Sequence, residues 1–425
     1  MIVKTVVRPE TEMKDSSIEY LGKIPTTWEK CRLKNVCTSF NSNITTSIIN
    51  KEHGNYKIFG ASGLIGYIEF ETMQDEYLGI VKDGAGVGRI GSYPSHSSLL
   101  GTLAYIIPND GINMKWLKYV IENMNLGESI DKTTIPHIYF STYGNNYIPF
   151  PSSDEQQAIA DYLDETCSKI DEIIAEAKAS IDEYKELKQA VIFDGISLGT
   201  KSCCEYKKTT LEGIKKIPVA WEYRKLKFLI KYIESGVSVN AGNEPATELE
   251  YGVLKTSCVS KMFFIPSENK SVNKDEYARV KCPVCGNTII VSRMNTPDLV
   301  GACAYIEKNI NNIFLPDRLW QVHFNDDVNV KYVYYCLISP YIRNYYSSLS
   351  TGTSSSMQNI SQGQFANAII PYPSLKEQKE IVEFLDKRTK EIDSLISEKE
   401  SLINDLEAYK KSLIYEVVTG KRRVV

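Results

Sequence analysis

Residues 148–164 read IPFPSSDEQQAIADYLD, and residues 370–386 read IPYPSLKEQKEIVEFLD. Both stretches contain Pro-x-Pro-Ser-x-x-Glu-Gln, at an offset of 222 residues. In each, the serine and the glutamate have the spacing of a capping box, which closes the first turn of a helix. Each stretch therefore predicts where a helix begins, and their likeness predicts that the chain is a duplication.

Other parts of the chain repeat as well. Residues 18–34 recur as 211–227, and both contain Ile-Pro-x-x-Trp-Glu. In the middle of each copy, Leu103, Asn109, Asp110, Asn113, Lys115 and Tyr119 correspond to Leu319, Asn325, Asp326, Asn329, Lys331 and Tyr335. The sequence between these matches diverges. Shared framing around divergent centres favours one scaffold that presents two different surfaces, over a duplicated fold whose centres drifted without purpose.

A long helix is predicted at the end of each copy. Helix-forming residues run without proline or glycine from Pro151 to Gly195 and from Pro373 to Gly420. About 43 residues at about 1.5 Å each give a helix of roughly 65 Å. Apolar residues step by four and three, which is typical of a seam packed on another helix. The seam residues are Leu163, Cys167, Ile170, Ile174, Ala177, Ile181, Tyr184 and Val191, then Leu385, Ile392, Ile396, Ile403, Leu406 and Leu413.

The apolar stripe is wider than one partner helix requires. A second edge consists of Ile173, Leu187, Ile192, Leu395, Leu402, Tyr409 and Ile414. A stripe of this width predicts further helices against it, which indicates a second protein.

The fold class predicted is α+β: two pseudo-symmetric α+β domains joined by two long antiparallel coiled-coil helices. Short strands are expected at 56–59, 77–82 and 103–107 with a helix at 115–123, and in the second copy at 252–255, 288–292 and 320–324 with a helix at 330–338. The predicted parts are an N-terminal extension at 1–17, a first domain at 18–149, a helix at 150–202, a second domain at 203–371 and a helix at 372–425.

Charge is distributed unevenly along the 425 residues. The net charge is -4, which argues weakly against a simple nucleic-acid binder. The first long helix (152–201) has 5 basic and 12 acidic residues, the first domain (18–151) has 11 and 12, and the second (205–371) has 19 and 15. Without the acidic helix the chain carries +3, which is compatible with DNA binding through local patches.

Localisation signals are absent from the sequence. The N-terminus has no apolar secretory core, and no stretch approaches 18 consecutive apolar residues. The ten cysteines form no compact disulfide framework. A cytoplasmic protein with reduced thiols is expected.

Motifs for catalysis or cofactors are weak. Gly86 to Gly91 match G-x-G-x-x-G, but the residues that follow are a poor helix start, so a glycine-rich hairpin presenting Lys82 and Arg89 is favoured over a nucleotide site. Cys282-Pro-Val-Cys285 resembles half of a zinc knuckle. Cys258, Cys303 or the Cys203-Cys204 pair would have to supply the remaining ligands. A turn before a strand is favoured over a zinc site. No nucleophile triad and no adenine-methyltransferase signature is visible, so no catalytic, cofactor or metal site is predicted.

The repeated motifs together resemble the specificity subunit of type I restriction-modification systems. The resemblance extends across nearly the whole chain. It rests on residues 15–28, both Ile-Pro-x-Pro-x-x-x-Glu-Gln segments, Ser-Gly-Leu-Ile-Gly-Tyr at 62–67 and Val-Ser-Arg-Met-Asn at 291–295. Two points depart from it: residues 1–12 precede the usual family start near Met13, and a cysteine turn replaces a common Lys-x-Gly-Asp turn at 282–286.

The resemblance implies a non-catalytic subunit with two target-recognition domains, each reading half of a bipartite DNA site. It also implies two methyltransferase subunits docked on the long helices, and helicase-nuclease restriction subunits. S-adenosylmethionine, ATP and Mg²⁺ are expected on those partners. The rival hypotheses are a self-contained DNA modification enzyme and a coiled-coil scaffold with two ligand-binding domains.

Basic, amide and hydroxyl side chains in the predicted loops suit contacts to phosphates and base edges. The predicted DNA-binding residues are Lys57, Ser62, Lys82, Arg89, Tyr93, Lys132, Thr133 and His137 in the first domain, and Lys255, Lys261, Arg293, Asn295, Arg318, Thr351, Gln358 and Asn359 in the second.

Overall fold

The computed structural model describes residues 5–84, 86–124, 126, 136–200, 205–211, 213–354 and 357–424. The chain divides into two compact units. The first unit contains residues 1–178 and 400–425, and the second contains residues 179–399. Each unit therefore holds one globular domain and a part of both long helices.

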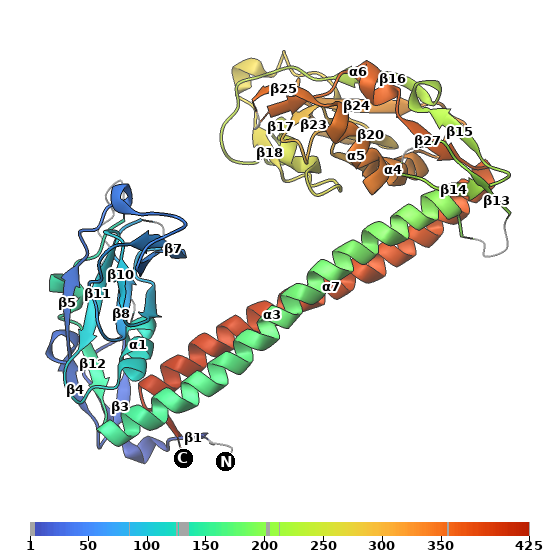
Figure 1. The fold of residues 1–425 in the computed structure, drawn as a ribbon. Coiled ribbons are helices and arrows are strands. Elements are labelled where there is room, and N and C mark those ends of the chain that lie inside the picture. The colour runs from blue at the N-terminus through green and yellow to red at the C-terminus, as the bar shows by residue number, and fades with distance from the viewer. Residues whose placement is uncertain are drawn as a thin grey trace. The chain divides into compact units, whose positions relative to one another are not determined.

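The first domain is built on an antiparallel sheet of order β5-β11-β8-β9 and a smaller sheet of order β10-β6-β7 (Figure 1). The helix α1 (Met114–Asn123) packs on β8 and β9 and buries Trp116, Leu117 and Ile121. The strands are β5 (Cys37–Asn41), β6 (Tyr56–Gly60), β7 (Gly63–Ile68), β8 (Tyr77–Val81), β9 (Ile90–Tyr93), β10 (Ser97–Leu99) and β11 (Leu103–Pro108). The predicted strands and helix of this domain are confirmed to within one residue.

The second domain repeats this plan and enlarges it. Its sheet has the order β16-β24-β20-β22, and α4 (Val330–Ile338) packs on β20 and β22. A second sheet has the order β18-β17-β23-β19, and a third the order β21-β26-β25. The strands are β16 (Ile230–Ser235), β17 (Gly252–Leu254), β18 (Asn269–Ser271), β19 (Pro283–Val284), β20 (Thr288–Ser292), β21 (Met294–Asn295), β22 (Cys303–Ile306), β23 (Ile310–Phe314), β24 (Leu319–Phe324), β25 (Thr351–Ser354) and β26 (Met357–Asn359).

Short paired strands lie where each domain meets its long helix. They are β2 (Met13–Asp15) with β3 (Lys23–Pro25), β4 (Glu29–Arg32) with β12 (Tyr147–Phe150), β13 (Tyr206–Lys208) with β14 (Lys216–Pro218), and β15 (Glu222–Lys225) with β27 (Ile369–Tyr372). The short helices are α2 (Phe140–Tyr143), α5 (Pro340–Leu349) and α6 (Gln362–Ala366). One-turn 3-10 helices include η2 (Leu33–Asn35) and η5 (Leu226–Phe228).

The long helices are α3 (Ser153–Leu198) and α7 (Leu375–Val418), of 46 and 44 residues. They run antiparallel side by side (Figure 1). The predicted capping box at the start of α7 is present: the Glu377 amide donates to the Ser374 hydroxyl at 3.4 Å, and the Ser374 amide donates to the Glu377 carboxylate at 3.3 Å. At the start of α3 one half of the box is found: the Glu155 amide donates to Ser152 at 3.4 Å, while the Glu155 carboxylate accepts from Trp28. Most of the predicted seam is buried, including Leu163, Cys167, Leu385 and Leu413. The predicted helix pair is confirmed.

The first helix continues past Gly195, the first glycine after Pro151, and ends at Leu198, inside the predicted range 150–202. A Cβ atom on Gly195 would lie 2.9 Å from Cδ2 of Leu385 on α7, so the two helices approach closely here and a larger residue would displace that leucine side chain. The helix instead stops before Gly199, whose φ of +76° is the left-handed conformation that ends many helices. The matching glycine after α7, Gly420, has a φ of +73°.

Residues 5–15, placed in the predicted extension, belong to the fold. The strand β1 (Thr5–Val7) pairs antiparallel with β28 (Arg422–Val424). Arg8 donates to Glu155 at 3.4 Å and its guanidinium lies over the ring of Trp28. Among the helices that the structure describes, none is long and apolar enough to cross a membrane.

Candidate functional site

The first domain is fixed to α3 by residues that the chain duplicates. The indole N–H of Trp28 donates to both oxygens of Glu155 at 3.0 Å. The Tyr119 hydroxyl donates to Asp164 at 2.8 Å, and the Lys115 ammonium lies 2.7 Å from the same carboxylate. Burial alone would raise the pKa of Asp164, but the hydrogen bonds from Lys115 and Tyr119 outweigh it and the pKa is lowered. This carboxylate therefore stays ionised at neutral pH and anchors α1 to α3.

The second domain has the same attachment to α7. Trp221 donates to Glu377 at 3.4 Å, and both Tyr335 and Lys331 contact Asp386 at 2.6 Å. The repeated motifs of the sequence are thus joints between a domain and its helix. Each domain therefore contacts its long helix through the same residues, while the sequence between the repeated motifs differs and gives each domain a different surface.

Six of the eight predicted second-domain residues lie at one place. In the sheet β21-β26-β25, Asn295 stands opposite Gln358, and Thr351 stands opposite Asn359. Next to this sheet, the amide of Arg293 donates to the carbonyl of Arg318, and the amide of Ile360 donates to the carbonyl of Arg293. Arg318 is exposed, and Arg293, Asn295, Gln358 and Asn359 are half-buried. We call this set (Arg293, Asn295, Arg318, Thr351, Gln358 and Asn359) the amide-arginine sheet.

The other two predicted residues of the second domain, Lys255 and Lys261, are not part of this sheet. Lys255 follows β17 and lies 3.7 Å from Glu268, and Lys261 is exposed after a 3-10 turn. Within the amide-arginine sheet, the Arg293 side chain is held by the backbone, since its Nε–H donates to the carbonyl oxygen of Asp317 at 2.9 Å. The amide-arginine sheet combines amides with cations on paired strands, which suits hydrogen bonding to base edges and phosphates.

The predicted residues of the first domain are more scattered. Lys82 and His137 line one hollow of about 350 Å³, together with the exposed aromatic rings of Phe40 and Tyr139. The His137 ring bonds Asp83 and packs on Tyr139 with ring centroids 4.1 Å apart. The sequence analysis did not identify Phe40 and Tyr139, because finding them beside His137 requires the register of the strands.

The glycine-rich segment forms the predicted hairpin. Strands β8 and β9 pair antiparallel on either side of it, and no helix follows. Arg89 donates to the carbonyl of Ala61 at 3.2 Å, beside exposed Ser62, while Lys57 is exposed on β6. Tyr93 packs instead on Tyr77 and Phe59, and burial raises its pKa. Lys132 and Thr133 lie outside the described residues, as do Cys203 and Cys204.

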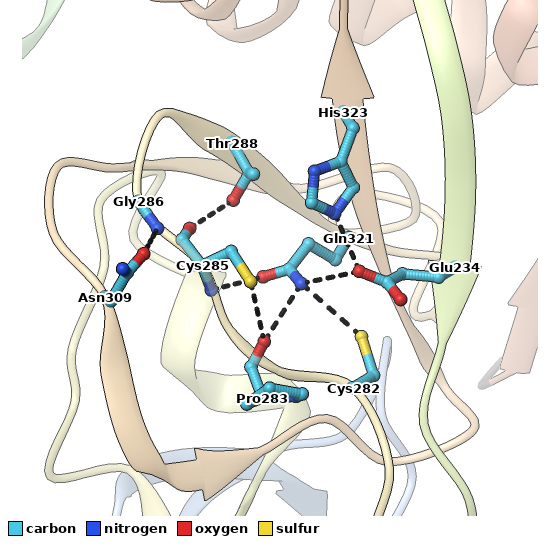
Figure 2. A network of polar contacts seen from close by, with 9 residues as sticks. All are labelled: Glu234, Cys282, Pro283, Cys285, Gly286, Thr288, Asn309, Gln321 and His323. Carbon is cyan, nitrogen blue, oxygen red and sulfur yellow. Dashed lines mark hydrogen bonds and ion pairs between the residues drawn. The ribbon is translucent and has the colours of Figure 1, made fainter.

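The segment at Cys282 and Cys285 is occupied by protein hydrogen bonds. Figure 2 shows the Gln321 side chain between this segment and Glu234. Its amide nitrogen donates to Glu234 at 3.0 Å, to the Pro283 carbonyl at 3.0 Å and to the Cys282 sulfur at 3.5 Å, and its oxygen accepts from the Cys285 amide at 2.8 Å. On the other side of Glu234, His323 lies 2.7 Å away.

Pro283 and Val284 between the cysteines form β19, which pairs with β23. Burial, and then the nearby Glu234 carboxylate, raise the pKa of both thiols, which disfavours the thiolate that a metal needs. Within the described ranges, no three His, Cys, Asp or Glu side chains are placed to hold a metal ion. The segment acts as the predicted turn before a strand, and the absence of a metal stays a prediction.

Comparisons with known proteins agree on one family. The sequence model described as the type I restriction modification DNA specificity domain matches residues 25–183 and again 218–405. The chain is 29% identical over 277 residues to the type I restriction enzyme MjaVIII specificity subunit of Methanocaldococcus jannaschii, covering 63% of this chain and 62% of the relative. It is 26% identical over 173 residues to the EcoEI specificity subunit of Escherichia coli, covering 40% and 29%. The chain thus spans less than two thirds of the length of either relative.

A solved structure has a similar fold over the whole chain. It belongs to work on complex assembly and conformational transition of the type I R-M system. The TM-score is 0.65 at 14% identity, and the match covers 94% of this chain and 99% of the other. At this identity the likeness concerns the fold alone.

Proposed function

The chain belongs to the type I restriction modification DNA specificity family, and we propose that it is the DNA specificity subunit of a type I restriction-modification complex. Each domain reads one half of a bipartite DNA site. The chain itself catalyses no step, and methyltransferase and restriction subunits supply methylation and cleavage.

The observation that carries this proposal is the pairing of identical joints with different surfaces. In one unit, Lys115 and Tyr119 bind the Asp164 carboxylate. In the other, Lys331 and Tyr335 bind the Asp386 carboxylate in the same way. A protein that reads two unrelated half-sites needs two readers with different surfaces on one kind of support. The amide-arginine sheet of the second domain supplies groups of the type that pair with adenine and guanine edges.

The long helices are proposed to dock two methyltransferase subunits. On the second edge of the apolar stripe, Ile173, Leu187, Leu395, Leu402 and Tyr409 remain 40–52% exposed, while Ile192 and Ile414 are buried. Exposed apolar residues repeated along a helix are a binding surface for further helices. S-adenosylmethionine, ATP and Mg²⁺ would be bound by the partner subunits, in the cytoplasm.

The weak positive charge of the domains sets an expectation for the isolated chain. With one nearly neutral domain and one of +4, it should bind DNA poorly alone. Methyltransferase partners would supply much of the phosphate contact.

An exchange of one domain tests the proposal. Replacing residues 18–149 with the corresponding domain of a relative should change one half of the methylated sequence and leave the other half unchanged. The reciprocal exchange of residues 203–371 should change only the other half. If both halves change in either exchange, two independent readers are excluded. Methyl transfer by the purified chain alone would favour the self-contained enzyme.

A further inference from the structure

Two basic turns occur at equivalent positions of the two copies, and all their residues are exposed except Lys225, which is half-buried. The first consists of Arg32 and Lys34, at the end of β4 and on η2. The second consists of Lys225 and Lys227, at the end of β15 and on η5. The offset of 193 residues aligns Arg32 with Lys225 and Lys34 with Lys227. We call these pairs the first and second basic turn.

Other repeated lysines close turns of the fold, whereas the cations of the basic turns form no ion pair among the described residues. Lys14 and Lys207, for example, donate to the carbonyls of Thr26 and Val219, which closes the same turn in each copy. Lys227 lies over the Phe228 ring at 5.0 Å and Arg32 over the Tyr147 ring at 5.5 Å. None of the four cations has a carboxylate partner among the residues that the structure describes. Cations that recur at equivalent positions of both copies with no carboxylate to neutralise them, among the described residues, indicate an anionic ligand common to both domains.

Each basic turn lies next to the predicted reading surface of its own domain. In the second domain, β26 of the amide-arginine sheet leads directly into α6, and α6 packs against η5. A helix of five residues spans about 7.5 Å. In the first domain, His137 leads into α2, and the amides of Leu33 and Lys34 donate to carbonyls just after α2. One short helix therefore separates each basic turn from residues predicted to read bases.

The second basic turn borders a shallow groove of about 460 Å³. Tyr223, Arg224, Lys225, Phe228 and Ile369 line it. Phe228 is 65% exposed, and the buried Tyr223 hydroxyl has no hydrogen-bond partner among the described residues. The groove thus offers cations and an exposed aromatic ring in one place, which suits a sugar-phosphate backbone.

We propose that each basic turn binds phosphates of duplex DNA immediately beside its half-site, independently of the sequence there. The inference rests on the proposed function and adds a second contact surface to it. Phosphates are the same at any sequence, so one pair of cations serves two domains that read different bases. An acidic protein partner is the competing occupant.

A salt titration tests this proposal. The full chain, co-purified with its methyltransferase partner, would be titrated with two duplexes that carry its methylated site. One duplex ends at the recognised bases, and the other extends about 20 base pairs on each side. The variant is Lys34→Gln with Lys227→Gln. The matched control is Lys23→Gln with Lys216→Gln, which removes two other repeated lysines; Lys23 pairs with Glu10 and Lys216 lies over the Tyr206 ring.

On the long duplex, the slope of log affinity against log salt should become shallower by about 2 in the variant, since each phosphate contact contributes about 0.9. On the short duplex, and for the control on either duplex, the slope should match the wild type. The methylated sequence should not change.

An unchanged slope on the long duplex would overturn the inference. An unchanged slope together with loss of the co-purified methyltransferase would overturn it in favour of an acidic protein partner. Failure of the proposed function is distinguishable, because then the wild-type complex itself would not prefer its site.

Discussion

At the scale of single residues, the joints depend on two carboxylates that hold a lysine and a tyrosine each. Replacing Asp164 by Asn should lower the free energy of unfolding of the first unit by about 1 kcal/mol at pH 7, because a partly exposed amide keeps a hydrogen bond and loses the charge attraction to Lys115. Urea denaturation would measure it. Glu172→Gln, on the same helix and exposed, serves as the control and should have little effect.

The same carboxylate predicts a pH dependence. Because the folded pKa of Asp164 is lowered, its stabilisation is complete above the usual aspartate pKa of about 3.9 and is lost as the pH falls through the lower folded value. The difference between wild type and Asp164→Asn should therefore be largest near neutral pH and disappear in acid. A difference that grows on acidification would contradict this assignment.

Also at the residue scale, the amide-arginine sheet predicts which half-site a substitution affects. Asn295→Ala and Arg318→Ala should each weaken discrimination at one base pair of the second half-site by about 1–3 kcal/mol. Binding to variant duplexes by the complex would measure it. Lys261→Ala, outside the sheet, should weaken binding equally at all sequences or leave it unchanged. Relaxed discrimination in the first half-site would contradict the assignment.

At the scale of elements, the helix pair is held in register by two equivalent ion pairs. Lys188 lies 2.7 Å from Asp393 in the second unit, and Lys410 lies 2.7 Å from Asp171 in the first. Lys188→Glu should destabilise the second unit by roughly 0.5–1 kcal/mol, and Asp393→Lys in the same chain should restore most of it. A double-mutant cycle by denaturation gives the coupling. No coupling would mean that the apolar seam alone sets the register.

The length of the helices predicts a second effect at this scale. Inserting about four residues, one turn of helix, into α3 should change the length of the non-specific spacer in the methylated site or abolish assembly. Both half-sites should keep their sequence. Mapping of methylated sites would show it, and an unchanged spacer with full activity would count against a role of the helices in spacing.

How far the sequence predicted these elements depends on how local their cause is. The capping box at Ser374, half of the one at Ser152 and the apolar seam are local patterns, and all three appear in the structure. The continuation of α3 through Gly195 is not a local pattern, because the close approach of this glycine to Leu385 is revealed only by the paired helix. The ion pairs across the helices were missed for the same reason, although their residues recur at the offset of 222.

At the scale of the whole molecule, the duplication predicted the fold plan and the family, while the residues of the candidate reading surfaces could be grouped from the sequence only in part. The repeated motifs contain the residues that join each domain to its helix, but the sequence did not show which of these residues contact each other. The gathering of Asn295, Thr351, Gln358 and Asn359 in one small sheet depends on strand register over some sixty residues of chain. The aromatic rings of Phe40 and Tyr139 beside His137 likewise come from separate segments. Sequence patterns show which groups are available, and folding decides which of them meet.

Genome-wide mapping of methyladenine, with and without this gene, tests the central claim most directly. Two independent readers on one support predict a single motif made of two specific halves and a fixed non-specific spacer. That motif should be methylated in cells that carry the gene and its methyltransferase partner, and unmethylated when this gene alone is deleted. A methylation pattern that does not change on deletion, or a lost motif that is continuous rather than bipartite, would contradict the account.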